Sequence, residues 1–348
     1  MTVTIDGTTG IDKVQDGSIV YADLDSNIPL GTKNLIINGD MRIAQRGTSA
    51  SGITSGGYYT VDRWQTNTGT GGTWTQSQDS DVPNGQGFGN SLKYSCTTAN
   101  ASLSAGSNLN LCHRFEGQML QHLKKGTANA ESVTVSFWVK SNKTGIYVFE
   151  LWDRDNDRHI ADTYTVSSAN TWEKKTITFA GDTSGAFDND ANKSLEANWW
   201  LVAGTDYTSG TAPTSWASRT NANRAVGQVN LADSTSNYIN ITGVQLEIGD
   251  TATPFENRMY SQELAMCQRY YEYQGGFFFA HLYNVSNTVV NISFAVPKRA
   301  APTLTRDSGS SPAPGFYGNT YFPYSTCYAY WAGSTAANNT NYIADAEL

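Results

Sequence analysis

The stretch Ser132-Val-Thr-Val-Ser-Phe-Trp-Val-Lys140 alternates apolar and mostly polar residues with a period of two. Successive side chains of a strand point to opposite faces, so this pattern predicts a strand with one face in a core and the other mostly in water. The turn Asn142-Lys-Thr-Gly145 and the apolar run 146–151 follow it, which predicts a hairpin. The residues expected to face the core are Val133, Val135, Phe137 and Val139.

Short runs of the same character recur along the chain and are separated by Gly, Asn, Ser and Thr. They lie at 92–96, 175–179, 200–203 and 238–241. Many short strands between turn residues predict an all-β protein with a jelly-roll β-sandwich.

The last of these runs changes the parity of its apolar residues across Thr242-Gly243, which predicts a β-bulge at Gly243. The polar, turn-rich stretches 66–80 and 203–226 are predicted to be loops, where binding function usually lies.

Three regions are expected along the chain. Residues 1–33 hold too few apolar side chains for a core and predict an extended N-terminal arm. Residues 34–258 form the sandwich domain, and residues 259–348 form a smaller C-terminal β module joined through one α-helix. That helix is predicted to begin with Ser261 as N-cap, to continue to Tyr271 and to be ended by Gly275-Gly276.

Composition excludes several classes of protein. The 348 residues suit about two domains, and 12% aromatic residues argue against disorder. A net charge of −8 with no basic run longer than a pair argues against nucleic-acid binding, and no stretch predicts a signal peptide or a membrane helix. The four cysteines fit no metal or redox spacing and are expected to be free core thiols of a chain made in a reducing cytoplasm. They are Cys96, Cys112, Cys267 and Cys327.

Several segments resemble the framework of jelly-roll carbohydrate-binding modules, and others resemble tail-fibre-type structural proteins of bacteriophages. The first kind comprises Asn34-Leu-Ile-Ile-Asn-Gly-Asp40, the strand 132–140, 170–179 and Ile241-Thr-Gly-Val-Gln-Leu-Glu247. The second kind comprises 38–47, Tyr59-Thr-Val-Asp-Arg-Trp64, Thr253-Pro-Phe-Glu256, Glu263-Leu-Ala-Met-Cys-Gln-Arg-Tyr-Tyr271, Ala300-Ala-Pro-Thr303 and Ala344-Asp-Ala-Glu-Leu348. The resemblance covers residues 34–348.

The resemblance implies a bacteriophage tail fibre protein that is synthesised in the cytoplasm of a host bacterium and works in the tail of the virion. By this implication the arm docks to tail or adaptor proteins, the assembly is a homotrimer and the outer end meets a host surface glycan or receptor. Related modules often place an acid near a structural calcium in the last strand. This chain has Thr242-Gly243 there, so no metal site is carried over.

Catalysis is not expected, although pairs of carboxylates that a glycan-cleaving enzyme needs could be found in Asp188-Asn-Asp190 or in Glu247 with Glu256. The run Asp153-Arg-Asp-Asn-Asp157 could supply such a pair too, and it begins like a calcium loop. It then has Arg158 where the loop needs Gly and Tyr164 where it needs Glu. A charged hairpin tip is therefore expected, and whether Asp153, Asp155 and Asp157 hold a cation stays open. No cofactor is expected.

Two sets of aromatic residues could stack on the apolar face of a sugar. For Trp199, Trp200, Tyr207 and Trp216, core packing is favoured. The second set is the candidate receptor or glycan site, because its neighbours have a loop composition in which rings tend to be displayed. A trimer interface could bury that set equally well. It consists of Tyr321, Tyr324, Tyr328, Tyr330 and Trp331.

The leading functional prediction is a tail fibre that attaches a virion to the host surface, most simply by binding glycans. A purely structural virion component, such as a collar, adaptor or capsid-decorating protein, is the first alternative. A glycan depolymerase is the second.

Overall fold

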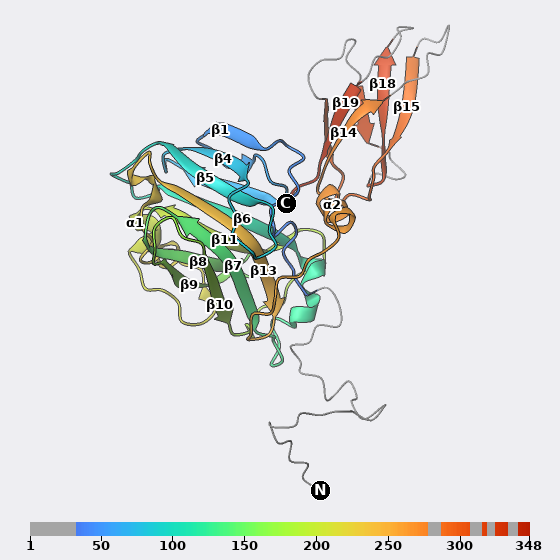
Figure 1. Ribbon diagram of the computed structural model, residues 1–348. Coiled ribbons are helices and arrows are strands. Elements are labelled where there is room, and N and C mark those ends of the chain that lie inside the picture. The colour runs from blue at the N-terminus through green and yellow to red at the C-terminus, as the bar shows by residue number, and fades with distance from the viewer. Residues whose placement is uncertain (1–32, 278–286, 307–314, 319–323, 333–339) are drawn as a thin grey trace, which may run out of the picture.

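The computed structural model describes residues 33–277, 287–306, 315–318, 324–332 and 340–348. Two large antiparallel sheets form a β-sandwich, and the chain then continues through a short helix into smaller sheets (Figure 1). The predicted all-β sandwich with a smaller C-terminal β module is confirmed. The arm predicted over 1–33 lies outside the described residues, except for Lys33. No helix among the described residues is long and apolar enough to cross a membrane.

The first sheet has six strands in the order β1-β4-β5-β13-β7-β10. Its strand β7 (Val133–Ser141), between β13 and β10, is the alternating stretch of the sequence, and all four apolar positions predicted for its core face are buried. The other strands are β1 (Ser49–Ile53), β4 (Thr73–Asp79), β5 (Ser91–Thr98), β10 (Glu173–Phe179) and β13 (Tyr238–Ile248).

The second sheet has seven strands in the order β12-β9-β8-β11-β6-β3-β2. The strands are β2 (Gly57–Tyr58), β3 (Trp64–Gly69), β6 (Asn108–Glu116), β8 (Gly145–Asp153), β9 (Arg158–Val166), β11 (Lys193–Ala203) and β12 (Ala217–Ser218). Short helical turns in the sandwich are η2 (Gly117–Met119), η3 (Gln121–Leu123), α1 (Thr205–Thr208), η4 (Asn221–Asn223) and η5 (Leu231–Asp233).

The core lies between the two sheets and is rich in aromatic rings. Trp199 of the second sheet lies 5.9 Å from Phe137 of the first, between ring centroids, and 4.7 Å from Phe149 beside it. All three side chains are fully buried. Aromatic pairs at such separations add about 0.5–1.5 kcal/mol each beyond the area that they bury, so this cluster ties the sheets together.

The predicted hairpin of 133–151 is wrong. β7 pairs with β10 and β13 in the first sheet, whereas β8 pairs with β9 and β11 in the second. The turn at 142–145 therefore carries the chain from one sheet to the other. This is possible because both strands place alternate apolar residues in the same core, β7 from one side and β8 from the other.

Two further predictions concern the turn-rich stretches. The prediction of a loop over 66–80 is wrong, since β3 ends and β4 runs there, with Trp74 buried as its core anchor. Both strands are rich in Thr and Gln, and buried side chains of the two strands bond across the sandwich: Gln76 of β4 donates to the Thr66 hydroxyl of β3 at 3.1 Å. The stretch 203–226 is largely irregular, as predicted.

The bulge predicted at Gly243 is confirmed. The register of β13 against β7 shifts between Thr242 and Gln245, and Gly243 has φ +60°. A Cβ added at Gly243 would meet the Phe88 ring at 2.5 Å, so both the backbone and the neighbouring ring require glycine here.

The helix exists but its predicted ends are wrong. α2 (Tyr260–Gln268) begins after Met259, whose N–H donates to the Gln262 Oε1 at 3.2 Å, so Ser261 lies in the first turn and is not the N-cap. Gly275-Gly276 does not end the helix. Tyr271 already belongs to β14 (Tyr271–Phe277), and the two glycines fall where the register of β14 shifts.

The C-terminal module contains two three-stranded sheets, in the orders β14-β19-β16 and β15-β18-β17. The strands besides β14 are β15 (Asn287–Ser293), β16 (Thr303–Arg306), β17 (Gly315–Gly318), β18 (Thr326–Ala332) and β19 (Thr340–Asp345). The module lies to one side of the sandwich, with α2 at its base (Figure 1).

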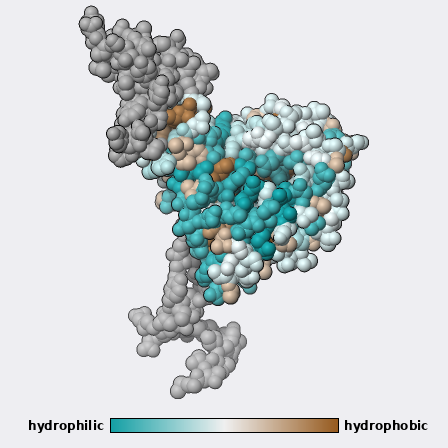
Figure 2. Space-filling view, turned by 180° about the vertical axis from the view of Figure 1, so that it is seen from behind, coloured by the Kyte–Doolittle hydropathy of each residue, from teal (hydrophilic) through white to brown (hydrophobic). Residues whose placement is uncertain are grey.

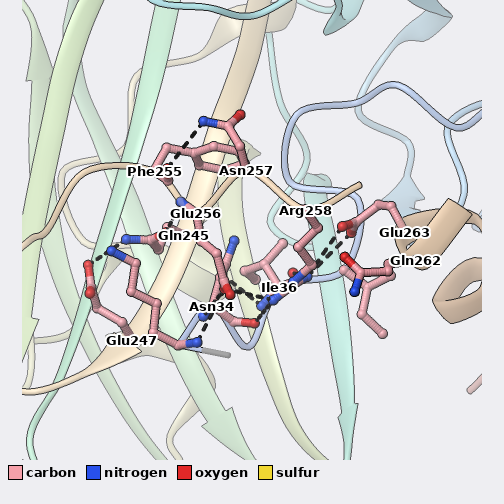
Figure 3. Close-up of polar contacts among 12 residues, drawn as sticks. Asn34, Ile36, Gln245, Glu247, Phe255, Glu256, Asn257, Arg258, Gln262 and Glu263 are labelled. Carbon is pink, nitrogen blue, oxygen red and sulfur yellow. Dashed lines mark hydrogen bonds and ion pairs between the residues drawn. The ribbon is translucent and has the colours of Figure 1, made fainter. Parts of the chain in front are cut away.

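The start of the sandwich is held by the segment that leads into α2 (Figure 3). Glu256 accepts hydrogen bonds from the backbone N–H of Asn34 at 2.8 Å and of Lys33 at 3.2 Å. Arg258 donates to the carbonyl oxygens of Asn34 and Ile36 and pairs with Glu263 at 3.4 Å. The contacts of Glu256 and Arg258 with residues 33–36 join positions more than 200 apart, and the Arg258–Glu263 pair links them to the first turn of the helix.

A second set of contacts holds the end of the chain. Glu347 forms an ion pair with Arg63, whose side chain is fully buried, and lies 3.3 Å from Arg46. Cys267 and Tyr270 of the helical region pack in a small buried cluster with Ile37 and Ile43 of the sandwich. The C-terminal module is thus anchored both where its chain enters and near its last residue.

Candidate functional site

The outward face of the seven-stranded sheet, away from the core, is unusually polar and yet buried. On β11 the residues that face outward are Glu196, Asn198 and Trp200, each no more than 2% exposed. Figure 2 shows hydrophilic residues massed across the middle of one broad face of the molecule. On a sheet face that is open to solvent, such side chains would be exposed. Because they are buried, other parts of the chain must surround this face and form a recess.

The long connection from β11 to β13 covers part of this face. Tyr207 and Ala225 pack with Trp200, and the Trp200 and Tyr207 rings lie 5.1 Å apart. The backbone N–H of Ala225 donates to the Tyr207 carbonyl at 2.9 Å, which holds the connection closed on itself. The stretch 203–226 therefore forms one wall of the recess.

Glu150 of β8 organises that wall. The Arg224 guanidinium makes two hydrogen bonds to its carboxylate, at 2.8 and 2.9 Å, and His159 Nδ1 and the Trp200 indole N–H each lie at 3.1 Å. Burial alone would raise the pKa of Glu150, but Arg224 and His159 hold it below its ordinary value. Glu150 is an anion that positions Arg224 over the recess.

Three more basic side chains gather around one carboxylate. Glu196 Oε1 lies 3.0 Å from Arg114 Nε, 3.7 Å from Lys193 Nζ and 4.0 Å from Arg154 Nε. Burial and the two neighbouring arginines lower the pKa of Lys193. The Arg154 guanidinium also stacks on the Trp152 ring, 3.7 Å from its centroid, which fixes its position.

Two amides at the floor of the recess lack protein partners among the described residues. Asn198 is fully buried, and neither its Oδ1 nor its Nδ2 has a hydrogen bond; Asn110 Oδ1 is likewise unpaired. Leaving such groups unpaired costs about 1–3 kcal/mol each, so buried polar groups nearly always have partners. They belong to a hollow of about 200 Å³, here called the polar hollow and defined by Asn110, Arg114, Arg154, Lys193, Glu196 and Asn198.

The arrangement suits a small, strongly polar ligand. The hollow is smaller than the roughly 300–1,000 Å³ of sites that enclose drug-sized molecules, and its size is that of one small unit of a larger ligand. Its amides offer donors and acceptors to hydroxyl groups, and its cations offer charge-assisted hydrogen bonds. Among the described residues no group of His, Cys, Asp or Glu is arranged to hold a metal ion.

A second hollow lies on the outer face of the other sheet. It measures about 420 Å³ and is lined by the half-buried rings of Phe88, Trp138 and Phe255, with Gln86 and Asn257 at its edge. The Phe88 and Phe255 rings meet edge to face at 5.2 Å. The rings of this aromatic hollow could stack on a sugar, but it has none of the buried unpaired amides of the polar hollow.

The aromatic residues predicted as a receptor site fall in the C-terminal module. Tyr324 is half exposed, and Tyr321 lies outside the described residues. Tyr328, Tyr330 and Trp331 lie on β18, the middle strand of its sheet, where the backbone of Trp331 pairs with Thr288. Their role as a binding site stays a prediction.

The other aromatic set is largely structural, as favoured from the sequence. Trp199 is in the main core, Trp200 is buried on the opposite face of the same strand, and Trp216 packs against the core while its indole donates to the Ala180 carbonyl at 2.9 Å. Tyr207 is half buried in the wall of the polar hollow.

The three aspartates of the calcium-like run each have protein partners. Asp153 is buried and pairs with Lys125 at 2.6 Å, Asp155 accepts the backbone N–H of Asp188 at 3.0 Å, and Asp157 pairs with Arg219 at 2.6 Å. The run forms the tip between β8 and β9, which confirms the predicted charged hairpin tip.

Three of the carboxylates considered for catalysis accept hydrogen bonds from backbone N–H groups. Glu247 accepts the N–H of Thr253 at 2.9 Å, Glu256 holds Asn34, and Asp190 accepts the N–H of Asn192 at 2.8 Å.

The polar hollow was missed from the sequence. The signal lies in Lys193-Ser-Leu-Glu-Ala-Asn-Trp-Trp200, where Glu196 and Asn198 alternate with the core residues Leu195, Ala197 and Trp199. Alternation alone predicts a wet face and does not reveal that a distant wall covers it.

Comparison with known proteins gives distant likenesses only. No family model matches the chain, and no curated protein matches it. Among solved structures, the bacteriophage CBA120 tailspike protein 4 enzymatically active domain is 16% identical, with a TM-score of 0.32, over 62% of this chain and 21% of that one. The module TmCBM61, solved with β-1,4-galactotriose, is 7% identical, with a TM-score of 0.33, over 63% of this chain and 100% of that one.

A family 11 carbohydrate-binding module from Clostridium thermocellum, in complex with a β-1,3-1,4-mixed-linked tetrasaccharide, is 12% identical, with a TM-score of 0.30, over 59% of this chain and 98% of that one. The likeness to these structures is one of sandwich fold.

Proposed function

We propose that this protein binds surface glycans of a bacterial host through the polar hollow, and that it does so as a non-enzymatic tail-fibre-type component of a bacteriophage virion. The hollow binds one saccharide unit of a glycan chain. Amide hydrogen bonds orient the hydroxyl groups, and no bond of the glycan is broken.

The proposal rests on the unpaired amide of Asn198. Its amide is fully buried, faces the hollow and has no hydrogen bond to the described part of the protein. A saccharide hydroxyl both donates and accepts, so one sugar ring satisfies Asn198 and Asn110 together. The unpaired amides then gain on binding what they lack in the free protein.

The place of this activity in a virion rests on the sequence resemblance over residues 34–348. In a homotrimer, three equivalent hollows would bind a repetitive glycan at once, so weak single-site binding becomes useful avidity. Tyr324 and the aromatic residues of β18, in the C-terminal module, would form a second region that contacts the host surface.

The test is binding of fluorescently labelled protein, residues 33–348, to a panel of bacterial strains with and without periodate oxidation of their surface glycans. We expect strain-selective binding that periodate abolishes and that Asn198→Leu reduces at least about tenfold, which is about 1.4 kcal/mol. Asn129→Leu, at an exposed position, is the matched control and should bind like the unaltered protein.

Binding that survives periodate would contradict glycan recognition, and equal binding by Asn198→Leu would contradict the polar hollow as its site. Failure to bind any strain would favour a purely structural virion role. Release of reducing sugar from the bound cells would favour the glycan depolymerase.

A further inference from the structure

The polar hollow contains more positive than negative charge. Arg114, Arg154 and Lys193 converge on the single carboxylate of Glu196, while Arg224 is matched by Glu150. The terminal carboxylate of Leu348 also accepts from Arg114, so four cations meet three carboxylates. One positive charge remains unmatched in the hollow that the unpaired amides line.

We infer that the unit bound in the polar hollow is an acidic saccharide, one that carries a carboxylate or sulfate group. This inference rests on the proposed glycan binding and names the chemical class of the ligand. The acidic group of the sugar meets the guanidinium groups and the ammonium around Glu196, and the sugar hydroxyls meet Asn198 and Asn110.

The basic groups are held in place before any ligand arrives. Arg154 is stacked on Trp152, and Arg224 is fixed by two hydrogen bonds to Glu150 and lies 4.5 Å from the same ring. A guanidinium presents a planar pair of donors that matches a carboxylate or sulfate. Because these side chains are already ordered, binding costs little further conformational entropy.

The three cations are more exposed to solvent than the carboxylate that they surround, so a ligand from solution can reach them. Arg114 is 13% exposed at its side chain, Arg154 27% and Lys193 33%, whereas Glu196 beneath them is 3% exposed. The carboxylate is thus the buried partner and the cations form the rim. An approaching anion meets positive charge first and is shielded from Glu196 by it.

The nearby acidic side chains do not cancel this charge. Asp157, at the adjoining hairpin tip, is paired with Arg219 at 2.6 Å, and Glu347 is paired with Arg63. Arg114 also donates to the terminal carboxylate of Leu348, the last residue of the chain, which offsets the charge of Arg114 and leaves Arg154 and Lys193 as the cations of the rim.

The test is a glycan array that carries uronate-, sialic acid- and sulfate-bearing glycans together with neutral glycans of matching linkage. We expect binding to one or more acidic glycans, and binding to the matching neutral glycan should be at least about tenfold weaker. Binding to the acidic glycan should also be weaker at 0.5 M salt than at 0.1 M salt, because the higher salt concentration screens the charges more strongly. Chemical reduction of the uronate carboxyl groups should abolish binding to uronate glycans.

The variants are Lys193→Gln and Arg154→Gln, each expected to weaken binding to the acidic glycan at least fivefold without changing binding to neutral glycans. Lys124→Gln is the matched control, because Lys124 is 55% exposed and pairs with Glu131 elsewhere on the surface. Far-ultraviolet circular dichroism and thermal unfolding check that each variant is folded.

Three results distinguish the acidic class of the ligand from the proposed glycan binding itself. Binding to neutral glycans alone, or equal binding to acidic and neutral partners, would overturn the acidic class and leave glycan binding in place. Binding to no glycan on the array would overturn both. Acidic binding that Lys124→Gln weakens as much as Lys193→Gln would indicate a general effect of net charge and overturn the placement in the hollow.

Discussion

The outward face of the seven-stranded sheet carries two kinds of buried polar residue with opposite energetic roles. Glu150 has every donor it needs from Arg224, His159 and Trp200. Asn198, on the neighbouring strand, has none among the described residues. The first kind holds the wall of the polar hollow, and the second lowers the stability of the free protein and is the group to which we assign the proposed ligand contact.

Replacing Asn198 by Leu should therefore leave the free energy of unfolding unchanged or raise it by up to about 1–3 kcal/mol, while glycan binding is lost. The measurement is urea unfolding followed by tryptophan fluorescence. Gln76→Leu is the control: Gln76 is fully buried and bonds Thr60, Thr66 and Tyr94, so its loss should destabilise. Destabilisation of Asn198→Leu by as much as the control would mean that the Asn198 amide is part of the fold.

Glu150→Gln should lower the free energy of unfolding by about 3–5 kcal/mol at pH 7, because it leaves the buried Arg224 without a counter-charge. In the folded protein the pKa of Glu150 lies below its ordinary value of 4.5. The stability it contributes is therefore present above pH 4.5 and is lost as the pH falls through the lower, folded-state pKa. Urea unfolding between pH 3 and 7 should show the deficit of the variant shrinking towards acid, and a deficit independent of pH would contradict the role of the charge.

Among the elements, strands with one clean alternation could be predicted and their partners could not. The residues of β7 and the bulge at Gly243 follow from local pattern, since a change of parity needs an extra residue. Which strand lies beside β7 depends on contacts with β10 and β13, distant in the sequence. A short turn followed by a second apolar run predicted a hairpin. The same pattern also occurs where a turn joins two strands that belong to different sheets, as it does here.

The polar hollow could not be predicted for a related reason. It needs residues of β6, β8 and β11 to meet across a sheet and a wall from 203–226 to cover them. The local sequence shows which side chains of these strands are polar, but it does not show that other segments bury them. Similarly, the end of α2 was set by the pairing of Tyr271 with Asp345, which no helix-ending residue signals.

Gly243→Ala tests the bulge of β13. We expect destabilisation by at least about 2 kcal/mol, since the backbone has φ +60° and the new methyl group would meet the Phe88 ring at 2.5 Å. Gly85→Ala is the matched control: its φ is +73°, but a Cβ there meets nothing within 4 Å. Thermal unfolding of both variants separates the cost of the backbone from that of the clash, and equal losses would show that the Phe88 contact is unimportant.

Over the whole molecule, the sandwich and the C-terminal module depend on buried charges at their junction. Glu347→Gln should destabilise the protein by about 3–5 kcal/mol, because the fully buried Arg63 then lacks its counter-charge. Glu131→Gln removes an exposed partner of Lys124 and should cost less than about 1 kcal/mol. Urea unfolding compares them, and similar small losses would show that Glu347 does not anchor the module.

Removing residues 1–32 should leave a folded protein that no longer joins virions. Lys33 is retained because its backbone N–H donates to Glu256 and its side chain donates to Thr253. Circular dichroism checks folding, light scattering checks that the mass is that of a trimer, and immunoblotting of purified particles checks incorporation. Incorporation of the truncated protein at the normal level would rule out the arm as the docking segment.

The two anchors of the C-terminal module also have a mechanical meaning. β14 leaves α2 beside the end of β19, with Tyr271 opposite Asp345, and two residues later Glu347 reaches Arg63 and Arg46 of the sandwich. A lateral force on the module therefore acts on two neighbouring connections to the sandwich, the covalent chain through α2 and the ion pairs of Glu347. Two connections resist rotation of the module better than one would. Torque applied there is passed on to β3 and β6, the strands that flank the polar hollow, through Arg63 and its bond to the Arg114 carbonyl.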